Sequence, residues 1–147
     1  MLEQARSSYI DALNVLAAIK MRKVSFTTED LMMAYMVVSE WCEWLERPNM
    51  EGSPLSGKHS TADSYATALN LMREHRKDLE IMLADEMDFV DVVFRSLNPN
   101  LLQIGKRIDA PGVPESTQRY YKMLTCTAKF FKDQTGYGGF CKILENC

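Results

Sequence analysis

The residues of this chain that could carry chemistry are its two histidines, its four cysteines and a cluster of carboxylates. His59 lies in a stretch rich in Pro, Gly and Ser, and His75 lies among charged residues. A di-metal helical bundle places a glutamate three residues before a histidine on an inward helix face, whereas Met72 stands at that position here. We therefore expect two solvated histidines rather than catalytic or metal-binding ones.

The cysteines and the clustered acids also fit structural roles. No Cys-x-x-Cys pair is present, which predicts free thiols. Cys126 lies among apolar residues of a helical pattern, where a small buried thiol is commoner than a nucleophile. Asp85, Asp88 and Asp91 share roughly one side of a helix and predict a solvated acidic face. We expect no enzyme and no metal or other cofactor, and a hydrolase built on Cys126 or these acids is the enzymatic alternative.

Length and composition predict one domain over residues 1–147. The N-terminal residues lack the apolar run of a signal peptide, and no segment has the length of apolar sequence that crosses a membrane, so we expect a cytoplasmic protein. Residues 61–97 carry an excess of acids and residues 98–147 an excess of bases, although the net charge is only −3. This balance disfavours general binding to polyanions.

The elements that must position these residues are organised around residues 60–97, which contain no Gly or Pro. The apolar residues of its first two thirds recur every three or four positions, as expected on one face of a helix. They are Ala62, Tyr65, Leu69, Met72, Leu79 and Leu83, with Arg76 filling one step. After Leu79 apolar residues surround the axis, so other helices must cover it. Asp85 or Asp88 could cap a second helix, and we expect a break there.

Flanking segments show the same helical spacing and no strand-like alternation. Helices are predicted at residues 2–22, from 25–30 to about 46, at 98–108 and at 114–134, with a last turn at 140–144 and a flexible loop at 48–60. Pro114 suits the first position of its helix, and Gly136 suits a left-handed stop. The predicted fold is an all-α bundle of six or seven helices.

The helices at 25–46 and 60–97 are rich in Met, Trp and Tyr. These residues give them more apolar surface than one flank of a bundle usually needs. Soft side chains of this kind form grooves that accept an amphipathic helix. The same surplus could fill a Met-rich core, or be buried in a homodimer.

The C-terminal third interleaves aromatic and basic residues, a pattern that can bind single-stranded nucleic acid by stacking and phosphate pairing. These residues are Arg119, Tyr120, Tyr121, Lys122, Lys129, Phe130, Phe131, Lys132, Tyr137, Phe140 and Lys142. Helical spacing places Tyr120 and Phe131 on the core side, which argues against a stacking platform. A nucleic-acid-binding or replication accessory protein is therefore the alternative function.

Residues 130–144 resemble the closing homology segment of the Bcl family of apoptosis regulators, in which an aromatic helix ends in a polar stretch, glycines and a last apolar turn. Asp133, Gly136, Tyr137 and Phe140 match this pattern, with Tyr137 in place of the family's tryptophan. Residues 30–35, 68–74 and 92–95 are similar to other segments of the family in the expected order. The family's Asn-Trp-Gly-Arg signature is missing, and we expect no membrane tail.

This resemblance implies a Bcl-like fold and a non-enzymatic inhibitor of apoptosis, of the short type that viruses encode. Such a protein sequesters the helical death motif of pro-apoptotic partners in an apolar groove, and would reach mitochondria through those partners. The groove would be lined by Tyr65, Leu69, Met72, Phe89, Val93 and Phe94. Lys106 or Arg107 would supply the cation that pairs with the partner's aspartate.

Overall fold

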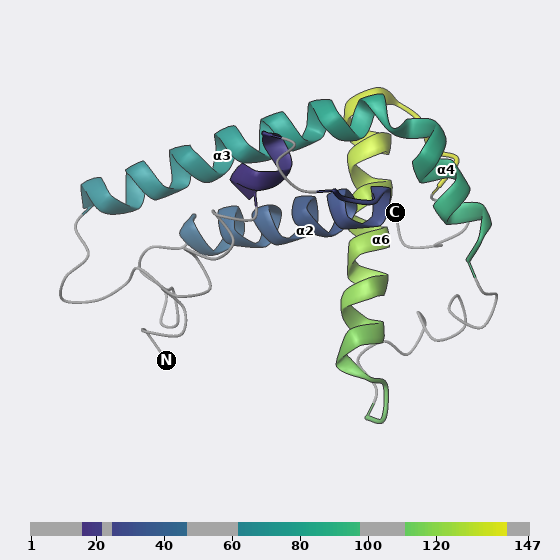
Figure 1. Cartoon of the computed structure of the whole chain (residues 1–147). Helices are drawn as coiled ribbons and strands as arrows, with labels where there is room; N and C mark the ends of the chain where they lie inside the picture. The colour runs from purple at the N-terminus through teal and green to yellow at the C-terminus, as the bar shows by residue number, and fades with distance from the viewer. Residues whose placement is uncertain (1–15, 22–24, 47–61, 98–110, 141–147) are drawn as a thin grey trace. The chain divides into compact units, whose positions relative to one another are not determined.

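The structure is a computed structural model, and it describes residues 16–21, 25–46, 62–97 and 111–140. All regular structure in these ranges is helical, which confirms the all-α prediction (Figure 1). The helices are α2 (Thr28–Leu45), α3 (Ala62–Asp85), α4 (Met87–Arg95) and α6 (Glu115–Thr135), preceded by a helical segment at residues 16–20.

The described residues form five helical segments, so the predicted six or seven helices are not reached. The helix predicted at 98–108 lies outside the described residues, and so does the turn at 140–144 apart from Phe140. The loop predicted at 48–60 and most of the first predicted helix also lie outside them. In the described ranges, no helix is long and apolar enough to cross a membrane.

The chain divides into two compact units. The first contains residues 1–26 and 37–79, and the second contains residues 27–36 and 80–147. Helices α2 and α3 therefore each contribute residues to both units. The organisation of residues 1–147 as one domain stays a prediction.

A reciprocal cap begins helix α2. The Thr27 hydroxyl accepts a hydrogen bond from the Asp30 backbone N–H at 3.1 Å, and the Asp30 carboxylate accepts one from the Thr27 N–H at 2.9 Å. Two donors that helical bonding leaves without partners are thereby satisfied. The start signal predicted at 25–30 is confirmed.

The long central stretch breaks at Glu86, where the chain turns between α3 and α4 (Figure 1). The break predicted near Asp85 or Asp88 is confirmed, but neither of these residues is the cap. Glu86 occupies the N-cap position of α4 and makes no side-chain cap. Its carboxylate instead accepts a long hydrogen bond, 3.5 Å, from the Thr28 hydroxyl at the start of α2.

Helix α6 begins and ends close to the predicted positions. Pro114 is its N-cap rather than its first helical residue. Gly136 adopts the left-handed conformation, with φ 76°, and its N–H donates to the carbonyl of Lys132 at 3.1 Å. The predicted glycine stop is therefore confirmed.

Aromatic side chains dominate the core of the second unit. The Phe140 ring stacks on Phe94 of α4, with centroids 4.5 Å apart, and meets Phe131 of α6 edge-on at 5.3 Å. Phe130 continues the contacts to Tyr35 of α2, at 5.4 Å. Three helices of this unit are thus joined through rings, each of which buries a large apolar area.

Candidate functional site

The strongest candidate for an interaction site is the outer surface of α4, defined here as Phe89 and Val92. These side chains are 62% and 59% exposed, and they lie three positions apart, so they are neighbours on the helix surface. Val90 and Phe94, on the other side of the same helix, are 0% and 2% exposed. Helix α4 is therefore anchored by one side and offers apolar side chains on the other.

Local interactions that do not involve this surface add to the helical stability that α4 gains from the burial of Val90 and Phe94. Arg95 and Asp91, four positions apart, form an ion pair of 2.8 Å. Asp88 lies in the first turn, where a carboxylate complements the positive end of the helix dipole. Substitutions at Phe89 or Val92 should therefore leave the helix intact.

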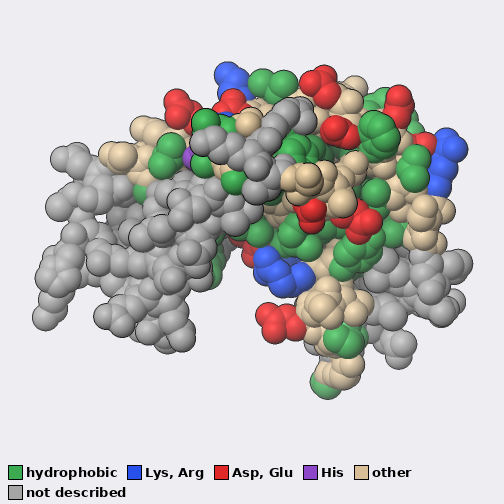
Figure 2. Space-filling model, in the orientation of Figure 1, with side chains coloured by type: hydrophobic (Ala, Val, Ile, Leu, Met, Phe, Trp, Pro, Cys, Tyr) green, Lys and Arg blue, Asp and Glu red, His purple; other side chains and the backbone are tan. Residues whose placement is uncertain are grey.

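Acidic side chains lie beside the outer surface of α4 (Figure 2). Asp85 and Asp88 are exposed, and neither pairs with a basic residue among the described parts of the chain. Between residues 80 and 97 the sequence contains five acids and a single base, Arg95, which is engaged by Asp91. Figure 2 shows hydrophobic side chains at the surface over α4 with acidic side chains beside them.

Three of the residues predicted to line a groove lie in the first unit. Met72 is fully buried and Leu69 is half-buried. Tyr65 lies in α3, but its side chain is outside the described part of the structure. Met72 therefore belongs to the core. This position agrees with the alternative interpretation, in which methionines fill the interior instead of lining a groove.

The other predicted groove residues divide between surface and core. Phe89 is exposed, Val93 is half-buried and Phe94 is buried against Phe140. Lys106 and Arg107, the predicted cations, lie outside the described residues. Of the six apolar positions, Phe89 is the one whose described side chain is mainly exposed.

The residues that match the family pattern have a structural explanation. Gly136 ends α6, and Phe140 anchors α4 to α6 through its ring contacts with Phe94 and Phe131. Tyr137 is 38% exposed and packs edge-on against Phe140 at 4.9 Å, while Asp133 is exposed. Helix termination and ring packing are sufficient reasons for this aromatic and glycine pattern.

His75 was predicted to be solvated, and this prediction is wrong. The residue is 8% exposed, in the first unit, and Lys20 from the helical segment at 16–20 contacts its ring. Lys20 also forms an ion pair with Asp78, one turn along α3. Burial lowers the pKa of His75 below 6.5, the charge of Lys20 lowers it further, and Asp78 and Glu74 oppose these effects.

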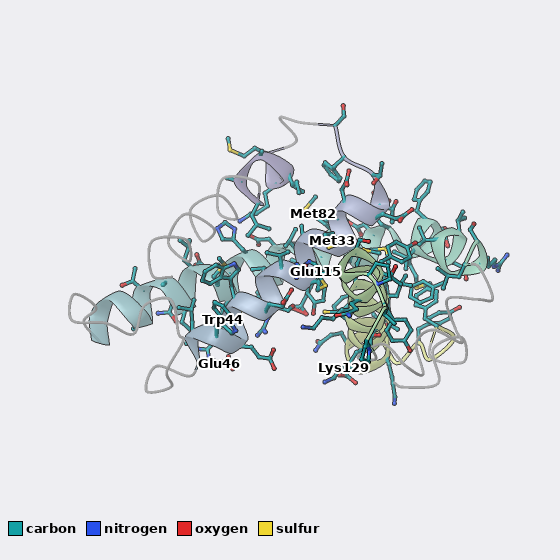
Figure 3. The ribbon with its side chains drawn as sticks, turned by 90° about the horizontal axis from the view of Figure 1, so that it is seen from below. Met33, Trp44, Glu46, Met82, Glu115 and Lys129 are labelled. Carbon is teal, nitrogen blue, oxygen red and sulfur yellow. The ribbon has the colours of Figure 1, made fainter. Side chains whose placement is uncertain are left out.

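The C-terminal end of α2 presents another exposed aromatic residue. Trp44 is 47% exposed and meets Trp41 edge-on, with ring centroids 5.7 Å apart. Figure 3 labels Trp44 and Glu46 at this end of the helix. Glu46 at the same end of the helix pairs with Arg73 of α3 at 3.1 Å. This ion pair and the Lys20 contacts link the helices of the first unit.

The described residues contain no group of three or more His, Cys, Asp or Glu side chains that could hold a metal ion. Cys42 is buried and forms no disulfide with another described residue. Cys126, predicted to be buried, is only half-buried, and it too forms no disulfide in the described part of the chain. The expectation that the chain binds no cofactor stays a prediction.

Comparisons of the chain with protein families, curated proteins and solved structures found no match. The fold defines an all-α protein. The resemblance to the Bcl family stays a prediction.

Proposed function

We propose that this chain is a non-enzymatic interaction protein that binds an amphipathic helix of a partner through the outer surface of α4. The observation that supports the proposal is the exposure of Phe89 and Val92 on a helix that is anchored through Val90 and Phe94. Side chains three positions apart on one helix match the spacing with which an amphipathic helix presents its own apolar residues. Burying each of them in a complex would contribute on the order of 1–2 kcal/mol.

The resemblance to the Bcl family makes the helical death motif of pro-apoptotic proteins the first candidate for this partner helix. In that case the protein would inhibit apoptosis by sequestering such proteins, and Lys106 or Arg107 would pair with the motif's aspartate. Association with mitochondria would follow from the partners. A second copy of the chain is the competing occupant, because a homodimer would bury the same apolar side chains.

The test is a titration of the full chain with a panel of amphipathic peptides that includes death-motif sequences. Saturable binding at micromolar concentrations that Phe89→Ala weakens is the expected result. Met21→Ala is the matched control, because Met21 is 63% exposed, close to the 62% of Phe89, and lies in the other unit. Absence of binding, or equal loss in both variants, would overturn the proposal, and a concentration-dependent dimer that Phe89→Ala dissociates would replace it with self-association.

The alternative, nucleic-acid binding by α6, has weaker support. Lys122, Lys129 and Lys132 are exposed, but Phe130 and Phe131 are buried and cannot stack on bases without rearrangement. Salt dependence separates the two proposals. Phosphate-driven binding weakens steeply as salt rises, whereas contacts of Phe89 should depend little on salt.

A further inference from the structure

The charges around Phe89 and Val92 specify a partner more narrowly than the apolar side chains do. Asp85 and Asp88 are exposed and form no ion pair with another described residue. Arg95, the only base between residues 80 and 97, is paired with Asp91. The surface that a partner would meet is therefore apolar, and no other described residue neutralises the carboxylates of Asp85 and Asp88 at its edge.

The helix dipole accounts for a carboxylate at position 88 but not for one at position 85. Asp88 lies in the first turn of α4, where it complements the helix dipole. Asp85 is the last residue of α3, and a carboxylate at a helix C-terminus is adjacent to the negative end of the dipole. No base lies in the last turn of α3 to offset it. A complementary cation on a partner would give Asp85 a favourable interaction.

We infer that the occupant of the outer surface of α4 is a basic amphipathic helix. Its apolar residues would cover Phe89 and Val92, and Lys or Arg side chains on the adjoining positions would face Asp85 and Asp88. Charge-assisted hydrogen bonds between guanidinium or ammonium groups and carboxylates are stronger than neutral ones. Nucleic acids and anionic membrane surfaces would be repelled from this face. The inference rests on the proposed function and adds the chemical class of the partner.

The experiment compares two designed helical peptides with identical apolar positions, one flanked by Lys and one flanked by Glu, in titrations of the full chain. We expect the Lys peptide to bind about tenfold more tightly at low salt, and the difference to shrink as salt rises, because exposed charges are screened. The double variant Asp85→Asn/Asp88→Asn should weaken the Lys peptide about three- to tenfold. Glu115→Gln is the control, since Glu115 is an exposed acid in the first turn of a different helix, α6.

The outcomes separate this inference from the proposed function. Equal affinity for the two peptides, or a loss in the double variant no larger than in Glu115→Gln, would overturn the basic partner while leaving helix binding in place. Loss of both peptides in Phe89→Ala, with charge preference retained in the wild type, supports both statements. If neither peptide binds, the proposed function fails first. Thermal unfolding of each variant shows whether a loss of affinity reflects the surface or the stability of α4.

Discussion

The Nζ atom of Lys20 lies 3.2 Å from the Nδ1 atom of His75. A lysine ammonium can only donate hydrogen bonds, so Nδ1 must be the acceptor and the proton of the neutral ring must lie on Nε2. Protonation of Nδ1 would remove this acceptor and place two cations in contact. The contact between Lys20 and His75 therefore forms only while the imidazole is neutral, whereas the ion pair between Lys20 and Asp78 does not depend on the protonation of the ring.

We predict that this contact makes the stability of the chain depend on pH in the mildly acidic range. The pKa of His75 is lowered from 6.5 in the folded state, so the unfolded state binds the proton first. As far as it depends on His75, the free energy of unfolding should be highest above pH 6.5. It should fall as the pH decreases from 6.5 toward the pKa of His75 in the folded state. Urea unfolding at a series of pH values measures this slope.

His75→Asn should remove the slope, and His59→Asn, at the only other histidine of the sequence, should retain it. Equal pH dependence in the wild type and His75→Asn would show that another group is responsible. Glu74 and Asp78, which raise the pKa of His75, are the acids whose substitution should steepen the dependence.

The burial of His75 also shows where sequence reasoning chose the wrong residue. Met72, His75 and Leu79 are separated by three and four positions, which is the spacing of a buried helical stripe. The predicted stripe contains Arg76 instead of His75, which lies among charged residues in the sequence. The structure half-buries Arg76 and buries His75 beside a lysine from a distant segment, a contact that helix periodicity cannot indicate.

The helix ends were predictable because they depend on local chemistry. The cap of Thr27 and the left-handed glycine at 136 are properties of a few neighbouring residues. The outer surface of α4 was not predictable in the same way, since Phe89 and Phe94 are both large and aromatic. Which of them is covered depends on Phe140, more than 40 positions along the chain from both.

The two aromatic residues of α4 should respond in opposite ways to truncation. Phe94→Ala removes a side chain that is 2% exposed and stacked on Phe140, and should cost about 3–5 kcal/mol of unfolding free energy. Phe89→Ala removes one that is 62% exposed, and should change stability by less than about 1 kcal/mol. Chemical denaturation of the two variants provides the comparison. A loss of several kcal/mol in Phe89→Ala would mean that its ring is covered in the free chain.

Tyr120 should be among the last tyrosines to ionise. Its pKa is raised to about 12, first by burial and then by the charge of Glu29 and a hydrogen bond with that carboxylate. Because the pKa in the unfolded chain is 10.0, stability attributable to Tyr120 should fall as pH rises from 10.0 toward 12. Tyrosinate absorbance against pH measures the ionisation.

In that titration Tyr120→Phe should remove the highest transition, and Glu29→Gln should shift it down without restoring the ordinary value, because burial persists. An unchanged titration in Glu29→Gln would exclude the interaction between α2 and α6 at this point.

Gly136 and Gly138 provide a matched pair for the stop of α6. A Cβ atom at either position would meet nothing within 4 Å, so packing does not distinguish them. Gly136 has φ 76°, whereas Gly138 is outside the left-handed region. An L side chain in that region costs about 1 kcal/mol, so Gly136→Ala should destabilise the chain by about this amount. Gly138→Ala should leave stability unchanged or raise it by a few tenths of a kcal/mol, because alanine reduces the entropy of the unfolded chain.

Thermal and urea unfolding of these two alanine variants tests whether the glycine pattern at the C-terminus serves the fold. A loss of about 1 kcal/mol in Gly136→Ala with none in Gly138→Ala would assign the first glycine to helix termination. This termination places Tyr137 and Phe140 for their ring contact at 4.9 Å. Equal changes of the unfolding free energy in both variants would contradict this assignment. The left-handed conformation of Gly136 would then have no effect on stability that Gly138 lacks. If Gly138→Ala weakened peptide binding at unchanged stability, the second glycine would belong to a partner contact rather than to the stop of α6.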